Sequence, residues 1–293
     1  MKVSIITPFV VPNRKVLNML KSCKKQTYKN IEILAVSEKT DLKMDGIKSI
    51  YVPHEKDVGK KRNIGAKEAK GEILFFVDCD CVLMPDTVQK LVEIFKEKGT
   101  DAVTGKPIAP IKGKILGIVT GWEYEDRFDE MGENFVDVAA TTCLGVKRSA
   151  FLDIGGFDVY SEKDLAVGED WDFSVRFRKR GYKIFHTNKV IVIHDHGDET
   201  LRHWLKRRIQ HSKYRIVHLK KYGKSFDQYS SFRMMVESTI FLSVPIMFRI
   251  LKKRRDFRVF ILPFFAFLRN IAWSIGVISG FIEFRRRSII SSK

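Results

Sequence analysis

The stretch that most constrains the fold is Ile73–Val77, five consecutive apolar residues that end abruptly at Asp78-Cys79-Asp80. An unbroken apolar run of this length predicts a strand buried on both faces, as in a parallel sheet. In open α/β sheets, ligands gather beyond the carboxyl ends of the strands. Two acids spaced one apart at such an end can offer oxygens to Mg²⁺ or Mn²⁺, which in turn would hold a diphosphate. Taken alone, the pattern also fits an ordinary acidic turn.

Strand-like and helix-like segments alternate around this stretch. Gly99 follows an amphipathic helical pattern, and Gly71 is expected to close the polar helix before the central strand. This alternation predicts an α/β fold with a mostly parallel, doubly wound sheet. The expected strands are Val3–Thr7 (stopped by Pro8), Ile31–Val36, Ile47–Val52 and Val190–Ile193, and the expected helices are Arg14–Lys25, Lys60–Lys70, Asp86–Lys98 and Trp171–Arg180.

Charge and cysteine content narrow the possible partners and the compartment. The formal net charge of +18 favours an anionic partner, which is a nucleic acid, a phosphorylated substrate or an acidic lipid surface. The four cysteines show neither zinc spacing nor a disulfide framework, which indicates reduced thiols and a cytoplasmic catalytic domain. Because the strand-like run Val3–Thr7 stands at the N-terminus, we expect no signal peptide.

Five short motifs carry a resemblance to the family 2 glycosyltransferases, which have the GT-A fold. The resemblance covers roughly residues 1–200 and implies a GT-A catalytic domain there, with a nucleotide-sugar half at about 1–105 and an acceptor half at about 106–200. A dinucleotide-binding Rossmann domain fits poorly, because no Gly-x-Gly-x-x-Gly follows the first strand. The motifs are QTYKNIEI at 26–33, GKKRNIG at 59–65 with AKGE at 69–72, Asp78-Cys79-Asp80 with Pro85-Asp86, GGFD at 155–158 and GEDWDF at 168–173.

The resemblance also implies a reaction and a donor site. It implies that a sugar is transferred from a nucleotide-diphospho-sugar with inversion at the anomeric carbon. The sequence departs from the family after the second strand, where Ser37-Glu38 stands in place of the usual Asp-Asp that holds the base. The residues assigned to the nucleotide side are Thr7, Pro8 and Phe9 at the end of the first strand, Glu38, Arg62 and Asp78.

The remaining site residues follow from the needs of the chemistry and from the family pattern. Charge on the leaving diphosphate calls for a divalent cation, Mn²⁺ or Mg²⁺, which we assign to Asp80 and to His194 after the last strand. His194 and His196 would face the same side of a strand, although a solvated polar turn is an equal reading. An attacking hydroxyl needs a general base, for which the family pattern indicates Asp170, with Glu169 as a supporting acid.

The composition changes after residue 200. We expect a basic amphipathic helical linker at 201–230 and hydrophobic, membrane-associated helices at 231–293. Two apolar segments, Met234–Ile250 and Val259–Phe284, are each interrupted by a charge, Glu237 or Arg269. Two full spans would place the basic link at 252–255 on the far side, against the positive-inside rule. We therefore expect helices that lie in the cytoplasmic leaflet, with a two-span hairpin as the alternative.

These observations together predict a membrane-associated, inverting glycosyltransferase whose acceptor is a hydroxyl of a lipid-linked glycan. One alternative is a polyprenyl-phosphate glycosyltransferase, which needs no base because its acceptor is already an anion. Another is a nucleic-acid-binding protein, but the basic residues lie beside apolar segments, so we expect an anionic membrane surface and no nucleic acid as partner. A catalytically inactive scaffold is disfavoured because Asp80 and Asp170 are both present.

Overall fold

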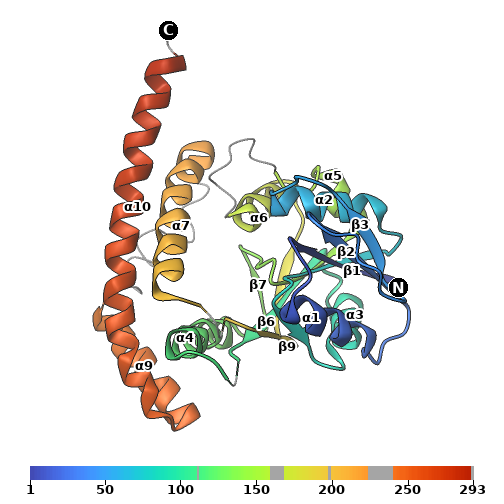
Figure 1. Ribbon diagram of the computed structural model, residues 1–293, viewed down its shortest axis with the longest axis horizontal. Helices are drawn as coiled ribbons and strands as arrows, with labels where there is room; N and C mark the ends of the chain where they lie inside the picture. The colour runs from blue at the N-terminus through green and yellow to red at the C-terminus, as the bar shows by residue number, and fades with distance from the viewer. Residues whose placement is uncertain (111, 159–167, 197–198, 224–239, 292–293) are drawn as a thin grey trace. The chain divides into compact units, whose positions relative to one another are not determined.

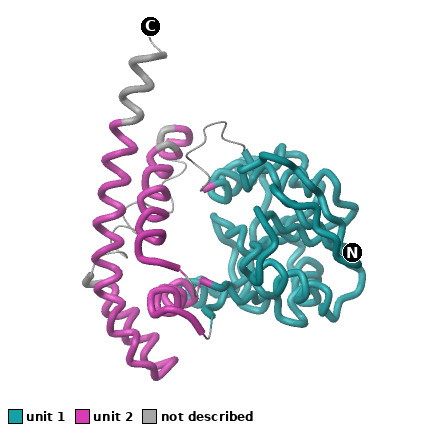
Figure 2. The backbone as a smooth tube through the Cα atoms, in the orientation of Figure 1, with its two compact units in different colours: residues 1–110, 127–161, 169–195 teal, residues 111–126, 162–168, 196–293 magenta. Residues whose placement is uncertain are grey.

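The computed structural model describes residues 1–110, 112–158, 168–196, 199–223 and 240–291 (Figure 1). The chain forms two compact units, which Figure 2 distinguishes by colour. Unit 1 comprises residues 1–110, 127–161 and 169–195, and unit 2 comprises 111–126, 162–168 and 196–293. The first part of the expected apolar segment 234–250, including Glu237, lies outside the described residues.

Unit 1 is built on one nine-stranded sheet with the order β3-β2-β1-β4-β8-β6-β9-β5, in which β7 also pairs with β9. The α/β architecture expected from the sequence is confirmed. The sheet is mixed, because β8 runs antiparallel between β4 and β6, whereas β1, β2, β3 and β4 are mutually parallel. The strands are β1 Val3–Phe9, β2 Ile31–Ser37, β3 Lys48–Tyr51, β4 Ile73–Val77, β5 Cys81–Leu83, β6 Ala102–Ile108, β7 Asn134–Val136, β8 Cys143–Lys147 and β9 Ile184–His194.

The helices of unit 1 agree with the sequence in position and differ at some ends. Helix α3 ends as expected, with Gly99 in the left-handed conformation at φ 57°. Helix α2 instead ends at Glu68, and Gly71 has a packing role: a Cβ there would lie 2.5 Å from Oγ of Ser4. Strand β1 continues through Pro8, where its pairing with β4 has already ended. The helices are α1 Arg14–Lys24, α2 Val58–Glu68, α3 Thr87–Lys98, α5 Arg148–Asp153 and α6 Glu169–Lys179.

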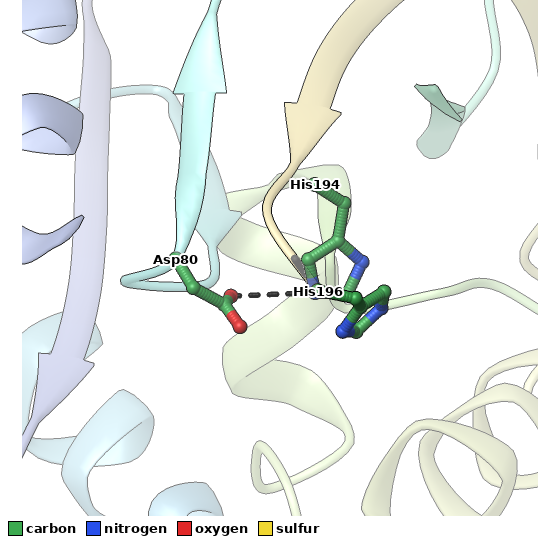
Figure 3. A group of neighbouring side chains, drawn as sticks. All are labelled: Asp80, His194 and His196. Atoms are coloured by element: carbon green, nitrogen blue, oxygen red, sulfur yellow. Dashed lines mark ion pairs between the residues drawn. The ribbon is translucent and has the colours of Figure 1, made fainter. Parts of the chain in front are cut away.

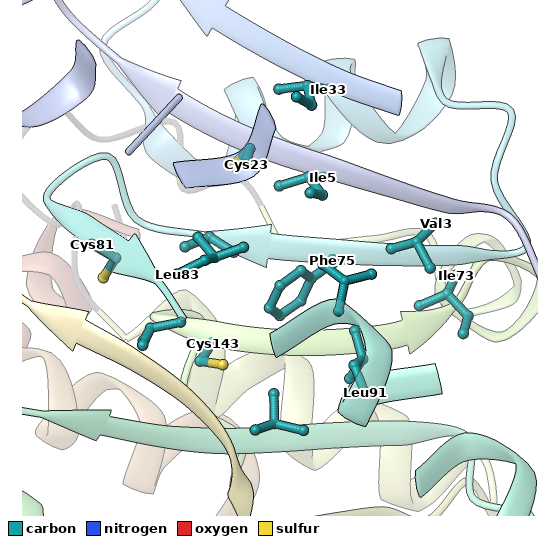
Figure 4. Packing of buried hydrophobic residues seen from close by; sticks show 14 of the residues in the cluster. Val3, Ile5, Cys23, Ile33, Ile73, Phe75, Cys81, Leu83, Leu91 and Cys143 are labelled. Atoms are coloured by element: carbon teal, nitrogen blue, oxygen red, sulfur yellow. The ribbon is translucent and has the colours of Figure 1, made fainter. Parts of the chain in front are cut away.

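Strand β4 is buried along its whole length, as the apolar run predicts. Phe75 belongs to the cluster on one face of the sheet, together with Val3 and with Leu91 of α3 (Figure 4). Phe76 belongs to the cluster on the other face, where its ring lies 5.1 Å from the rings of both Phe151 and Phe157. Packing on both faces of the sheet therefore holds β4 in place, and with it the residues Asp78–Asp80 that follow the strand.

Unit 2 is helical, and α7 and α10 pack together within it. Gly276 and Gly280, one turn apart on α10, allow close contact: a Cβ at Gly276 would lie 2.3 Å from the carbonyl oxygen of Ile209 on α7. Small residues at this spacing are typical of closely packed helix pairs. The helices of unit 2 are α7 Leu201–Tyr222, α9 Ile240–Arg254, η2 Phe257–Ile261 and α10 Leu262–Ser291, joined by most of α4, which spans Ile115–Met131.

Helix α10 and η2 carry a long apolar segment. Among the described residues, Phe257–Ile282 is the one helical stretch long and apolar enough to cross a membrane, with a mean hydropathy of 1.7 and 33% of its best window buried. One such helix is weak support for membrane association. Large apolar side chains are exposed along it: Phe257, Phe260, Phe264, Phe267, Ile271, Ile275, Ile278, Phe281 and Ile282.

Candidate active site

The predicted metal ligands lie at the carboxyl ends of two strands: Asp80 follows β4, and His194 is the last residue of β9. The pairing pattern makes β9 parallel to β6, and β6 runs the same way as β4 because β8 is antiparallel to both. The carboxyl ends of β4 and β9 therefore meet the same edge of the sheet. The short strand β5 follows Asp80 and pairs Cys81 with His194, which brings the two chain segments side by side.

Asp80, His194 and His196 form the candidate metal group (Figure 3). Nε2 of His194 lies 3.3 Å from Oδ1 of Asp80, and one potential ligand atom from each of the three residues lies within 4.8 Å of the others. The sequence predicts Asp80 and His194 as ligands and predicts only that His196 lies on the same side as His194. The structure adds His196 to the group.

The segment that carries the histidines is tied to β4 and α1. The backbone N–H of Asp195 donates to the carbonyl of Asp80 at 2.9 Å, and Nζ of Lys15 donates to the carbonyl of Asp195 at 2.8 Å. The same ammonium lies 3.6 Å from the Asp195 carboxylate. Sequence reasoning missed Lys15, although a cation in the first turn of a helix is unfavourable without an outside partner and was a usable signal.

Arg62 of α2 connects the end of β4 to the start of α6. Its Nη2 donates to Oδ1 of Asp78 and its Nη1 to Oε1 of Glu169, each at 2.6 Å. Arg62 is only 2% exposed, and its Nε has no acceptor among the described residues. Burial by itself lowers the pKa of Arg62, but the charges of Asp78 and Glu169 and their hydrogen bonds outweigh it and raise the pKa. The guanidinium therefore stays charged and holds both carboxylates in place.

Asp170 is partly buried at the start of α6, and its own amide neighbour Trp171 donates to its carboxylate at 2.9 Å. Burial and then the negative charge of Glu169 raise the pKa of Asp170 to about 8, against the opposing effects of the Trp171 N–H and Arg62. A carboxylate with a pKa near neutrality is the stronger proton acceptor that general-base catalysis favours. The raised pKa therefore gives Asp170 the electrostatics of a base.

Several motif residues act as scaffold for these groups. Asn63 closes a pair of hydrogen bonds with the backbone of Phe157, at 2.8 and 2.9 Å. Arg176 donates to Asp172 at 2.6 Å and to the carbonyls of Ile154 and Gly156 at 2.8 Å each. These contacts join the GGFD segment to α2 and α6. Asp172 therefore has a structural role: it lies in the first turn of α6 and also pairs with Arg176.

Of the residues expected on the nucleotide side, Arg62 and Asp78 are described above, and the others lie at the ends of β1 and β2. Thr7 and Phe9 are buried in β1, and the hydroxyl of Thr7 has no hydrogen-bond partner among the described residues. Glu38 is 7% exposed, with its carboxylate 3.9 Å from Nζ of Lys61, which also donates to the carbonyl of Phe9 at 3.4 Å. Burial lowers the pKa of Lys61, while Glu38 opposes the shift. Glu38 thus has a cationic partner that the sequence analysis did not identify.

Several known proteins resemble this chain in sequence or in fold. An uncharacterised glycosyltransferase of Haemophilus influenzae is 25% identical over 66% of this chain and 71% of its own length. The glycosyltransferase GlyG of Streptococcus pneumoniae is 27% identical over 35% of this chain and 38% of its own length. A mannosyltransferase of Pyrobaculum calidifontis, solved with GDP-mannose and Mn²⁺, has a similar fold at 13% identity. It matches with a TM-score of 0.58, over 96% of this chain and 86% of its own.

The family model for glycosyl transferase family 2 matches residues 4–154, slightly more than half of the chain, and this range contains both the strand that ends at Asp78-Cys79-Asp80 and the Arg62 segment. The expected GT-A fold and glycosyltransferase class are confirmed. The chain belongs to glycosyl transferase family 2.

Proposed function

We propose that this glycosyltransferase moves a sugar, with inversion, from a nucleotide-diphospho-sugar to a hydroxyl group of an amphipathic acceptor held at a membrane. The observation that supports this most directly is the grouping of Asp80, His194 and His196 at the same sheet edge as the Arg62 network. Donor-side and acceptor-side acids are joined by one arginine in this arrangement. It suits a reaction in which a leaving diphosphate and an attacking hydroxyl meet.

The donor set of the metal group fits Mn²⁺ better than Mg²⁺. One carboxylate and two imidazoles offer oxygen and nitrogen ligands, whereas Mg²⁺ prefers oxygen ligands throughout. Asp80 and His194 are the residues that would hold the ion, with His196 as a third ligand. When bound, the cation would neutralise charge on the diphosphate of the donor. The Pyrobaculum mannosyltransferase was solved with Mn²⁺ and GDP-mannose, which supports this choice of cofactor and donor class.

Asp170 is the proposed general base. Its carboxylate would accept the proton of the acceptor hydroxyl as the new glycosidic bond forms and the bond to the diphosphate breaks. Burial raises the pKa of Asp170, and the negative charge of Glu169, which Arg62 holds in place, adds to the shift. A phosphate acceptor would not need this base, so the raised pKa favours a hydroxyl acceptor over the polyprenyl-phosphate alternative.

The membrane location is supported by the exposed apolar face of α10 and η2. Side chains such as Phe264, Ile271 and Ile278 are about half exposed on a helix of high hydropathy. Burying such a face in a lipid leaflet is favourable, whereas leaving it in water is costly. A membrane-bound enzyme of this kind would meet an acceptor that is itself anchored in lipid.

The test is a panel of UDP-, GDP- and dTDP-sugars with Mn²⁺ or Mg²⁺, in which release of the nucleotide is followed for the wild type and two variants. Asp80→Asn removes the proposed ligand and should abolish metal-dependent turnover. Asp195→Asn is the matched control, because it removes a neighbouring acid that pairs with Lys15. If Asp80→Asn keeps activity in chelator-treated buffer, or if both variants lose activity equally, the metal assignment is wrong.

A further inference from the structure

A cluster of arginines forms in unit 2, where α10 packs on α7. Arg207 and Arg208 lie on α7, and Arg269 lies on α10. Nη1 of Arg269 donates to both carboxylate oxygens of Glu123 at 2.7 and 2.6 Å, and Nη2 of Arg207 donates to Glu199 at 3.0 Å. In the described part of the chain, no carboxylate pairs with Arg208, whose guanidinium stands over the ring of Trp204 at 5.5 Å.

The cluster holds more hydrogen-bond donors than the protein satisfies. Arg269 is 7% exposed, and its Nε and Nη2 are buried with no acceptor among the described residues. The Nε atoms of Arg207 and Arg208 are likewise buried and have no acceptor among the described residues. Buried donors are nearly always paired in folded proteins, because an unpaired one loses its hydration without compensation. The ring of Trp204 below Arg208 lies 6.2 Å from the ring of Phe265, which is one turn before Arg269 on α10, so the two arginines come from facing stretches of α7 and α10. This part of unit 2 therefore lacks oxygen atoms that could accept from their guanidinium groups.

The charges are unbalanced in the same direction. Among the described residues, the printed ion pairs of these three arginines involve two glutamates, and none of these pairs includes Arg208. Burial, and next the charges of Arg207 and Arg269, lower the pKa of Arg208 to about 10, although Glu199 and Glu123 oppose the shift. A bound oxyanion would supply both the missing charge and the missing acceptors.

We propose that Arg208 and Arg269 form a phosphate-binding site within unit 2. Arginine is suited to phosphate because its planar fork can give two parallel hydrogen bonds to one group, and a phosphate has enough oxygens to serve two forks at once. The exposed apolar side chains of α10 make an amphipathic ligand, a lipid phosphate or lipid-linked diphosphate, the favoured source. That choice of source rests on the proposed function, whereas the site itself does not.

The test is binding to the purified full chain in detergent, with inorganic pyrophosphate as the probe and no sugar donor present. Arg208→Gln should weaken pyrophosphate binding about 10- to 100-fold, which corresponds to the loss of one or two charge-assisted hydrogen bonds. Arg202→Gln is the matched control: it removes the same charge from an exposed position on the same helix and should leave binding nearly unchanged. Arg208→Lys keeps the charge without the fork and should give an intermediate loss.

A second arm separates the sources of phosphate. The full chain is reconstituted into phosphatidylcholine vesicles with and without phosphatidic acid, and hydrogen exchange of α7 is measured. Protection by phosphatidic acid that is lost in Arg208→Gln supports a lipid phosphate, whereas protection by pyrophosphate alone supports a soluble diphosphate.

Two results overturn the site. One is the absence of any effect of either probe on the wild type, and the other is an equal loss of binding in Arg202→Gln and Arg208→Gln. Neither arm measures turnover. The two experiments can therefore be interpreted even if the proposed glycosyl transfer is wrong.

Discussion

Replacing Arg62 with methionine is the sharpest test of how the candidate active site is held together. Methionine retains much of the length and apolar stem of arginine and removes only the guanidinium. Asp78 and Glu169 would then lose the cation that each contacts at 2.6 Å. The two carboxylates would be left near Asp170 without this cation, in a region where Arg62 itself is almost completely buried.

The size of the effect follows from the two contacts. A hydrogen bond to a charged partner contributes about 1.5–3 kcal/mol, so two such bonds represent roughly 3–6 kcal/mol. Removing one partner of a buried ion pair costs about 3–5 kcal/mol by an independent route. The side chains of Asp78 and Glu169 are 29% and 18% exposed, so water would solvate part of the released charge. We therefore expect unit 1 to lose about 3 kcal/mol of unfolding free energy, at the lower end of both ranges.

Hydrogen exchange of the peptides from α2 and α6 in denaturant measures this loss locally, without assuming that the two units unfold together. The matched control is Arg180→Met. Arg180 also makes two hydrogen bonds to a carboxylate, at 2.8 and 3.2 Å to Asp153, but its side chain is 63% exposed. Because exposed ion pairs contribute little to stability, Arg180→Met should hardly change the unfolding free energy. Equal effects of the two substitutions would refute the reasoning, because burial would then not decide the value of the arginine.

Three further outcomes are expected. Turnover of the wild type should rise with pH through about 8, because a raised pKa keeps Asp170 protonated below that value; Asp170→Asn should lower turnover about 10²- to 10⁴-fold and remove this pH limb. Glu123→Gln should cost unit 2 about 3–5 kcal/mol, measured by urea unfolding, and an apolar replacement of both Glu123 and Arg269 should recover most of it. The full chain should remain with membranes through a high-salt wash, because burial of the Phe257–Ile282 face is not screened by salt; release by salt alone would contradict this.

Much of unit 1 was predictable because its strands and helices have strong local patterns. The apolar run Ile73–Val77 gave the central strand residue for residue, and Gly99 marked the end of α3. The antiparallel insertion of β8 was not predictable, because the apolar pattern of a strand does not indicate whether it pairs parallel or antiparallel to its neighbours. The helix α4 was also missed, because its aromatic and acidic residues show no simple amphipathic stripe.

The candidate site was predictable as a set of residues and not as a set of contacts. The spacing of acids after β4 indicated Asp80, and the strand-end position indicated His194, which the structure places 3.3 Å apart. Nothing in the spacing showed that Arg62 would contact Asp78 and Glu169, because Glu169 lies 107 residues away in the chain. The same holds for Lys61 and Glu38, whose pairing depends on how α2 lies over β2. The roles of these residues in catalysis stay predictions.

The acids of α4 change how the basic C-terminal segments should be interpreted. From the sequence, the link at 252–255 and the arginines beside it suggest attraction to an anionic membrane, at about 1 kcal/mol for each cation near the surface. In unit 2, Lys253 and Arg254 instead share Glu125, and Arg249 pairs with Asp126 at 2.7 Å.

Each of these pairs reduces the charge available to lipid headgroups, and Arg269 in the middle of the apolar helix is likewise matched by Glu123. The electrostatic part of membrane binding should therefore be smaller than the net charge of +18 suggests. The apolar face of α10 then carries more of the binding. The cations that have no acid partner among the described residues, Arg208 foremost, are those with a capacity left for a phosphate group.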